Sequence, residues 1–294
     1  MNMARVLLPV LLVGFALSGC ATLLEPQRPA DNTRLTPPSR ATRDLVNLPP
    51  PKGRVVVAVY GFRDQTGQYR LAPESTFSSS VTQGAASLLV KALKDSDWFI
   101  PVEREGLQDL LTERRIVRAL ESPNDKEKPG VNLPPLRPAS ILIQGGIVGY
   151  ETNVLTGGLG ARLMGVGADS HYQMDQVTIN LRSVDIRSGQ VLNSISTTKT
   201  IYSIQVSTGV YRFIDFKKLL EAETGFTRNE PAQLAVKEAI ETAVVHLIVQ
   251  GVRDGVWALN DAKEVSHPVV QRYLREEDEQ LQSFAAGNDP VVKR

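Results

Sequence analysis

The sequence predicts an α+β fold, in which an α/β domain carries two transmembrane β-hairpins that join an oligomeric β-barrel. Apolar, β-branched runs alternate with amphipathic helical patterns over residues 53–150, which is typical of an α/β domain. Two later segments, residues 154–174 and 204–228, alternate apolar and polar side chains over lengths that suit paired membrane-crossing strands. After residue 20 no apolar run approaches the roughly 18 residues of a transmembrane helix, so any membrane crossing must use β-strands.

The N-terminus predicts a secreted and lipidated chain. Residues 1–19 form a signal peptide, with a positive charge at Arg5 and an apolar run at residues 6–17 that is too short to span a bilayer. The run ends in LSGC, a bacterial lipobox, in which the thiol of Cys20 is acylated and the chain is cut before it. The alternative is an ordinary signal peptide with a chance cysteine. Cys20 is the only cysteine, so the chain has no disulfide framework and no cysteine metal cluster.

The lipid predicts where the protein resides. We expect S-diacylglycerol and an N-acyl chain on Cys20, and several acyl chains make a durable anchor where one would bind reversibly. The next residue is Ala21, whereas an aspartate there would favour the inner membrane. The expected location is therefore the cell outer membrane, with the main domain in the periplasm.

Composition argues against an enzyme and against a nucleic-acid partner. The formal net charge is +1, so no strong field attracts nucleic acid. The three histidines, His171, His246 and His267, share no metal-ligand spacing, and no GxxxxGK[ST] motif occurs. Asp169 and Asp175 suit pore-lining or turn positions better than a catalytic pair. We expect no catalytic residue, no cofactor, no metal and no ATP drive.

The first half of the chain predicts a tether followed by a β-α-β-α-β arrangement. Residues 20–52, rich in Pro, Arg and Thr, read as an extended lipidated tether. The periplasmic α/β domain then covers residues 53–150. Its expected elements are a buried strand at 53–60, a long polar loop at 62–77, a helix at 78–93, a strand at 98–100, an inward-facing amphipathic helix at 103–120 and a strand at 141–150. Long loops of this kind are often functional.

The second half predicts a periplasmic β-hairpin at residues 175–203, with strands at 175–186 and 190–202 and a turn ending in Gly189. The longest helix is expected at residues 231–259, within a segment 229–260. Its expected cap is Asn229 or Glu230, and Pro231 occupies the favoured first position. Residues 261–294 form a charged tail, either mobile or partly helical.

The two hairpins together predict a ring of subunits. Residues 154–174 hold five glycines beside an apolar-polar alternation, and residues 204–228 repeat an apolar-out, polar-in pattern. A tilted strand crosses a bilayer in about 9 to 11 residues, so each segment has room for two passes and a turn. Alternation is a weak signal, and a soluble sheet with two amphipathic hairpins remains the alternative. Because four strands cannot close a barrel, membrane crossing would require several copies in a closed ring.

Six long, ordered motifs carry a family resemblance over nearly the whole mature chain: DLVNLPPPKGRVVVAVYGFRDQTGQYR (44–70), LLVKALKDSDWFIPVEREGLQDLLTERRIVRA (88–119), GGIVGYETNV (145–154), GGLGAR (157–162), GVGAD (165–169) and GVYRFIDFKKLLEAETGFTRNEP (209–231). In these motifs the sequence resembles the curli secretion channel lipoproteins of the CsgG type. The resemblance implies a ring of nine subunits with a shared barrel, a CsgE-like periplasmic cap, a CsgF-like nucleation coupler and unfolded curli subunits as the exported substrate.

The resemblance also implies a pore constriction built from the loop at residues 62–77. The family's loop carries a tyrosine, an asparagine and a phenylalanine, of which only the phenylalanine is matched, by Phe77. Ala72 and Thr76 stand at the other two positions, so we expect a wider pore, and Glu74 adds a possible ring of carboxylates. The alternative function is a soluble periplasmic lipoprotein that binds or regulates cell-envelope machinery.

Overall fold

A computed structural model describes residues 35–67, 82–120, 133–156, 171–206, 210–213 and 231–285. The signal peptide, Cys20 and the tips of both predicted transmembrane hairpins lie outside the described residues. The chain divides into two compact units, Met1–Pro37 and Pro38–Arg294, and nearly all of the described residues belong to the second.

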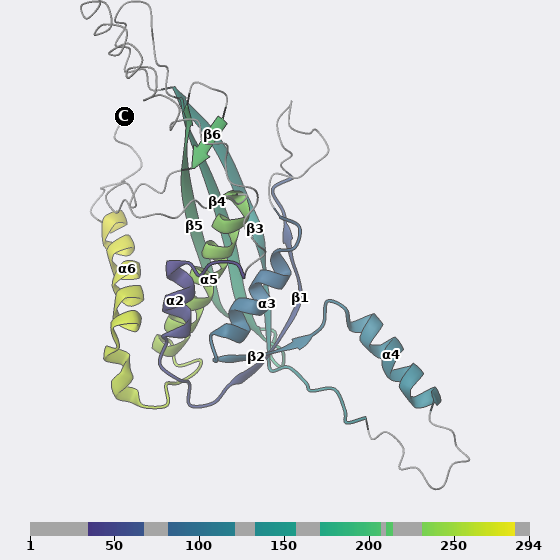
Figure 1. Ribbon diagram of the computed structural model, residues 1–294. Coiled ribbons are helices and arrows are strands. Elements are labelled where there is room, and N and C mark those ends of the chain that lie inside the picture. Colours follow the sequence, from purple (N-terminus) through teal and green to yellow (C-terminus); the bar gives the residue numbers. More distant parts are fainter. Residues whose placement is uncertain are drawn as a thin grey trace, which may run out of the picture. The chain divides into compact units, whose positions relative to one another are not determined.

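A six-stranded mixed sheet organises the second unit, with the strands in the order β2-β1-β3-β4-β5-β6 (Figure 1). The first three strands along this sheet are parallel, and the last four are antiparallel. The strands are β1 (Val55–Asp64), β2 (Phe99–Glu103), β3 (Ile141–Thr156), β4 (His171–Asp185), β5 (Val191–Val206) and β6 (Val210–Phe213). The sequence therefore predicted β1, β2 and the hairpin of β4 and β5 correctly.

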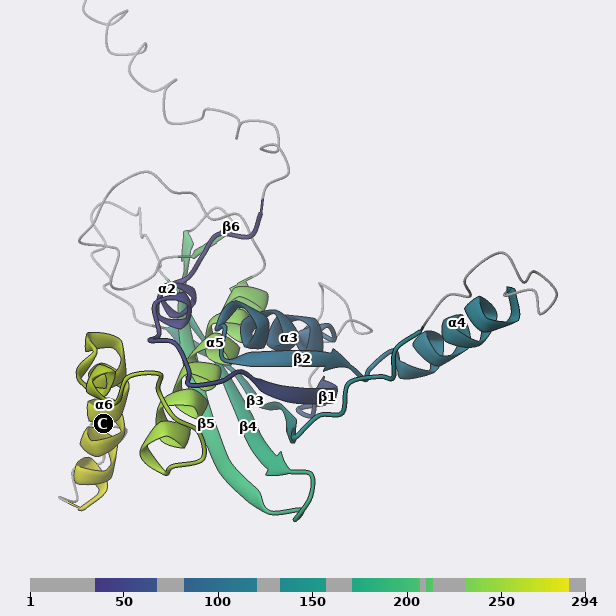
Figure 2. The same ribbon diagram turned by 90° about the horizontal axis from the view of Figure 1, so that it is seen from below.

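Helices cover one face of this sheet. α5 packs on β4 and β5, α3 packs on β1 beside α5, and α2 and α6 pack on α5 (Figures 1 and 2). The helices are α2 (Arg40–Val46), α3 (Ala85–Asp95), α4 (Leu107–Leu120), α5 (Pro231–Arg253) and α6 (Pro268–Ala285), with a short 3₁₀ helix, η2 (Ala262–Ser266). Among the described helices, none is long and apolar enough to cross a membrane.

The core lies between the sheet and α5, and alternation along the strands produces it. In β4, Val177, Ile179 and Leu181 are fully buried, because successive strand residues point to opposite faces. Facing them, α5 contributes buried apolar side chains along most of its length, including Ile240 and Leu247. Buried apolar area of this kind stabilises by roughly 25 cal/mol per Å².

Three sequence-based boundaries differ from the structure. The helix expected at residues 78–93 is described only from Ala85, where the first buried residues of α3 begin. The helix expected at 231–259 ends at Arg253, because the chain turns so that Trp257 packs against Gly251. Within the expected tail, residues 268–285 form α6, whose Val269, Val270 and Tyr273 are buried, so the helical alternative holds there.

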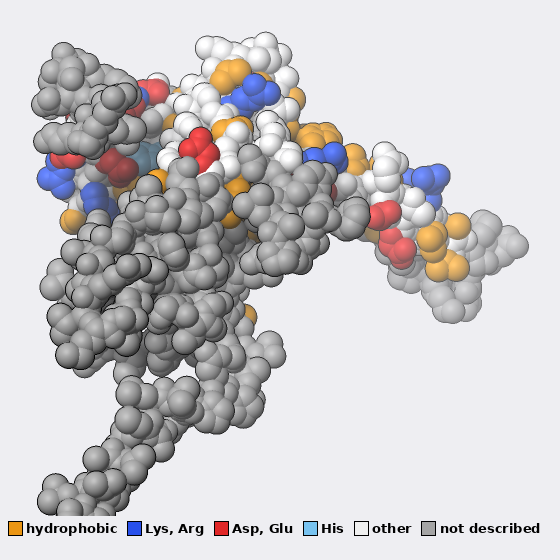
Figure 3. All heavy atoms as spheres, turned by 90° about the horizontal axis from the view of Figure 1, so that it is seen from above, with side chains coloured by type: hydrophobic (Ala, Val, Ile, Leu, Met, Phe, Trp, Pro, Cys, Tyr) orange, Lys and Arg blue, Asp and Glu red, His pale blue; other side chains and the backbone are white. Residues whose placement is uncertain are grey.

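Two expectations about packing were wrong. Residues 40–46 were expected to be extended tether, but they form α2, with Ala41 and Leu45 buried against the core. The helix expected at 103–120 was predicted to face inward, yet α4, at residues 107–120, has no buried residue. Figure 3 shows its apolar and charged side chains together at the surface, and Leu120 is 79% exposed. An amphipathic pattern indicates that one face of a helix can be buried, but it does not say which surface covers that face.

Candidate functional site

The structure describes the two ends of the predicted constriction loop. Ala72, Glu74, Thr76 and Phe77 lie outside the described residues, as does the lipidation site at Cys20. Their predicted roles therefore stay predictions. What the structure places is the chain as it leaves β1, up to Gly67, and the chain as it returns before α3.

A close approach between β1 and β3 holds the start of the loop. Phe62 lies opposite Gly145 in the parallel ladder, after a register shift in β1. A Cβ on Gly145 would lie 2.8 Å from the Phe62 ring and 2.1 Å from the carbonyl oxygen of Asn180 in β4. A Cβ on Gly146 would lie 2.6 Å from the Arg63 carbonyl oxygen. The pair of glycines thus lets β1 lie close to β3 at the point where the loop begins.

The two ends of the loop meet at one carboxylate. Asp64, the last residue of β1, accepts hydrogen bonds from the backbone N–H of Thr66 at 2.9 Å and from its hydroxyl at 2.7 Å. On its other oxygen, Asp64 accepts from the side-chain amide of Gln83 at 3.3 Å. Gln83 lies two residues before the start of α3. The sequence suggested no such contact, because nothing in the pattern pairs residue 64 with residue 83.

Beyond the end of β1, four strands share one row of the sheet. Thr156 of β3 pairs with His171 of β4, His171 pairs with Gln205 of β5, and Gln205 pairs with Tyr211 of β6. At this level β1 has ended, because its ladder with β3 stops at Ile147. Within the described strands, the outer edge of upper β3 and the outer edge of β6 therefore have no ladder partner.

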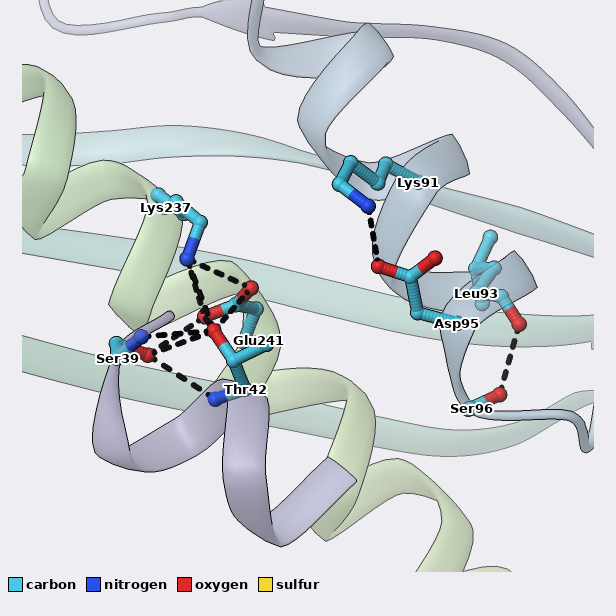
Figure 4. A network of polar contacts seen from close by, with 8 residues as sticks. All are labelled: Ser39, Thr42, Lys91, Leu93, Asp95, Ser96, Lys237 and Glu241. Carbon is cyan, nitrogen blue, oxygen red and sulfur yellow. Dashed lines mark hydrogen bonds and ion pairs between the residues drawn. The ribbon is translucent and has the colours of Figure 1, made fainter. Parts of the chain in front are cut away.

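A buried polar network attaches α2 to α5 (Figure 4). Lys237 and Glu241 of α5 form an ion pair of 3.0 Å, with only 9% and 6% of their side chains exposed. Ser39 donates its hydroxyl to Glu241 at 2.8 Å, and Thr42 donates to both oxygens of the same carboxylate at 2.9 and 2.8 Å. The Lys237 ammonium also donates to the Thr42 hydroxyl at 2.9 Å. The network fixes the point at which the chain enters the folded unit.

The residues of this network combine local and distant signals. Ser39 caps α2, and Ser39 and Thr42 form a capping box. Lys237 and Glu241 are four residues apart on one helix, a spacing that brings two side chains together. Both patterns are visible in the sequence, although neither indicates that the two helices meet.

A second set of contacts holds α6 on α2 and α5. The Tyr273 hydroxyl lies 3.1 Å from an Asp44 oxygen, and burial together with the Asp44 charge raises the pKa of Tyr273. Arg272 pairs with the other Asp44 oxygen at 2.5 Å. His246 of α5 lies 3.7 Å from Glu276. The contact with His246 lowers the pKa of Glu276, more than burial raises it.

The lowered pKa of Glu276 predicts an acid-sensitive attachment of α6. A carboxyl with a lowered folded-state pKa contributes stability above its unfolded value, and this contribution is lost as the pH falls through the folded value. In thermal melts between pH 6 and 3, Glu276→Gln should lower the midpoint by about 1–2 °C at pH 6, since contacts to a half-exposed carboxylate contribute little. The difference should close below pH 4.5. Glu279→Gln, exposed on the same helix, is the control, and a gap that persists at pH 3 would contradict this assignment.

Over the described residues, no group of three histidine, cysteine, aspartate or glutamate side chains is placed to hold a metal ion. His246 and His267 do not meet: His246 packs edge-on against Tyr273, whereas His267 accepts from the backbone of Val269.

Comparison with known proteins identifies the family. The family model "Curli production assembly/transport component CsgG" matches residues 39–277. The curated relatives include the curli production assembly/transport component CsgG of Escherichia coli (strain K12), 46% identical over 87% of this chain and 92% of the relative. The protein of that name in Salmonella typhimurium (strain LT2) is 45% identical over 90% and 95%. That from Citrobacter koseri is 46% identical over 87% and 92%. The chain therefore belongs to the CsgG family of curli production assembly/transport components.

Proposed function

We propose that this protein is an outer-membrane lipoprotein whose copies form a ring-shaped, ATP-independent channel, and that the channel exports unfolded curli-type amyloid subunits. The observation that carries the proposal is the pair of open edges on the upper sheet, described above. Membership of the curli assembly/transport family supports the substrate class.

The edges support a ring because a membrane interior does not tolerate unpaired backbone groups. Upper β3 and β6 lie at opposite ends of the same row of strands, and both leave one side unpaired among the described strands. Pairing β6 of one copy with upper β3 of the next satisfies both edges at once. Repeated head-to-tail pairing closes into a ring when the rotation fits, and the family implies nine copies.

α4 supports assembly independently of the strands. It carries an amphipathic pattern but buries no residue against the described chain, and Ile116 and Leu120 are exposed. Exposed apolar side chains gathered on one element mark interaction sites. Another subunit of the ring is the proposed partner for this helix.

We propose that the loop after β1 forms the constriction. Its root lies where β1 ends beside Ile147, at the base of the four-stranded upper sheet. In a ring, the corresponding loops of all copies would meet on one level around the axis. Phe77 would then form an aromatic ring, whereas Ala72 and Thr76 would leave the opening wider than in relatives that carry a tyrosine and an asparagine there.

The proposed export step is driven by entropy and needs no nucleotide. A disordered chain confined in a chamber loses conformational entropy, so release from the chamber is favourable. A CsgE-like cap closing the periplasmic side would leave the constriction as the only exit, and a CsgF-like coupler would receive the chain outside. Undiminished export through a chamber sealed by a permanently bound cap would argue against this mechanism.

A single purification tests the proposed function against the soluble alternative. Protein extracted from outer membranes should require detergent, migrate as a large heat-labile ring and open ion channels in planar bilayers. Because Ala72 and Thr76 are small, the conductance should exceed that of tyrosine-bearing relatives measured in the same salt. Cys20→Ala is the control for lipidation and should leave the chain uninserted. A water-soluble monomer without channel activity from the wild-type chain would favour the regulatory lipoprotein instead.

A further inference from the structure

The carboxylate of Asp64 contacts the chain on both sides of the loop that follows β1. One oxygen accepts two hydrogen bonds from Thr66, which closes a tight turn immediately after the strand. The other oxygen accepts from Gln83, directly before α3, so one side chain contacts the chain shortly before Gly67 and shortly after Thr82. The turn alone needs only the first oxygen. The contact with Gln83 therefore requires another explanation.

Asp64 and Gln83 each lie beside an anchored element of the fold. Asp64 is paired with Ile147 in the ladder, and the next residue donates its backbone N–H to the Ile147 carbonyl oxygen at 2.9 Å. The Gln65 side chain occupies the space above Gly146, where a Cβ would lie 2.7 Å from its amide nitrogen. On the returning side, α3 begins with Ala85, which is fully buried. Asp64 thus joins two anchored segments.

We propose that Asp64 is the positioning residue of the constriction loop, because it holds both roots of the loop at a fixed separation. The inference rests on the proposed channel function for its consequence, but its geometry does not depend on that function. Fixing the two ends of a connecting segment reduces the conformations that the segment can sample. In a pore, fewer loop conformations mean a narrower spread of openings and therefore a steadier ion current.

The test compares four variants of the full-length chain. Asp64→Ala removes the contacts of Asp64 with both roots, whereas Gln83→Met removes the Gln83 amide and leaves the contacts between Asp64 and Thr66. Asp64→Asn removes the negative charge but keeps an oxygen for Thr66 and an amide that can donate to a flipped Gln83 side chain. Asp95→Ala is the matched control, since Asp95 is an aspartate of α3 that pairs with Lys91, away from the root.

Two readouts separate this inference from the channel function. Trypsin can cut after Arg70, the only lysine or arginine in residues 67–82, at a rate that reports the access of the protease to that bond. Asp64→Ala and Gln83→Met should speed this cut by roughly three- to tenfold, since hydrogen bonds to a partly exposed charge are modest. Asp64→Asn and Asp95→Ala should stay within about twofold of wild type. The noise of the open-channel current should follow the same order.

Distinct outcomes would overturn the inference. Cleavage and noise at wild-type level in Asp64→Ala would show that the carboxylate does not hold the loop. Wild-type behaviour in Gln83→Met beside fast cleavage in Asp64→Ala would reduce Asp64 to a turn residue. Asp64→Asn behaving like Asp64→Ala would assign the effect to charge rather than contact. If the wild-type chain forms no channel but Asp64→Ala and Gln83→Met are cut faster, the proposed function fails and the positioning role stands.

Discussion

Replacing Glu241 with alanine should lower the free energy of unfolding by about 3–5 kcal/mol, because it leaves the buried ammonium of Lys237 without its carboxylate. Glu241 also accepts the hydroxyl hydrogen bonds of Ser39 and Thr42, so one substitution removes every carboxylate contact in this network. Urea denaturation followed by tryptophan fluorescence measures the loss, since both Trp98 and Trp257 are buried.

A double variant separates the ion pair from simple packing. Lys237→Met combined with Glu241→Leu replaces both charges with apolar side chains of similar length, and a buried pair exchanged in this way is often neutral or stabilising. The double variant should therefore lie within about 1 kcal/mol of wild type. A single variant as stable as the double variant would mean that Lys237 finds water or another partner, and that the network does not retain α2.

Gly145→Ala should be the most damaging of the glycine substitutions in the sheet. The added methyl would lie 2.1 Å from the carbonyl oxygen of Asn180, and backbone atoms in a ladder cannot move without breaking the pairing of β3 with β4. The same methyl would lie 2.8 Å from the Phe62 ring. Overpacking of this kind typically costs about 1–3 kcal/mol, and the backbone contact places this case at about 3 kcal/mol or above.

The matched control is another glycine of the same sheet. At Gly61 in β1, the nearest atom to an added methyl is the Arg63 side chain at 3.8 Å, an ordinary contact. The free energy of unfolding of Gly61→Ala should therefore lie within about 0.5 kcal/mol of wild type. Gly145→Ala should unfold at a clearly lower urea concentration or fail to accumulate. Equal urea midpoints for the two variants would show that β3 and β4 can separate locally at little cost.

Local periodicity predicted the elements of this protein well but predicted their partners poorly. The strand predicted at residues 175–186 lies within β4, where Val177, Ile179 and Leu181 are buried, because strand residues alternate between faces whatever packs on them. The pattern of α4 was equally clear, yet none of its residues is buried and Ile116 and Leu120 are exposed, because the pattern says nothing about whether the covering surface belongs to the same chain. Helix α2 was missed because its short segment is surrounded by Pro- and Arg-rich sequence, and only two of its residues, Ala41 and Leu45, are buried.

The root of the loop and the α2–α5 network were beyond prediction for a related reason. Asp64 and Gln83, like Ser39 and Glu241, are brought together only by the fold. Taken alone, each of these residues looks like an ordinary polar side chain exposed to solvent. The glycine pair of β3 gave a partial signal, since a glycine inside a strand pattern often indicates close backbone approach. The lipobox and the constriction residues lie outside the described residues, and their assignments stay predictions.

The unbroken ladder between β4 and β5 has a mechanical consequence. The two strands pair without a register shift from His171 and Gln205 down to Ser183 and Asn193, through the upper row and on into the part covered by α5. At about 3.3 Å per residue, this is a stiff ribbon roughly 40 Å long. If the upper part of the ribbon lies in the bilayer, β4 and β5 move as one rigid body. Tilting the part that α5 covers would then strain the barrel strands. The strands would then resist widening of the barrel. Changes in the width of the pore would have to come from the loops that follow β1.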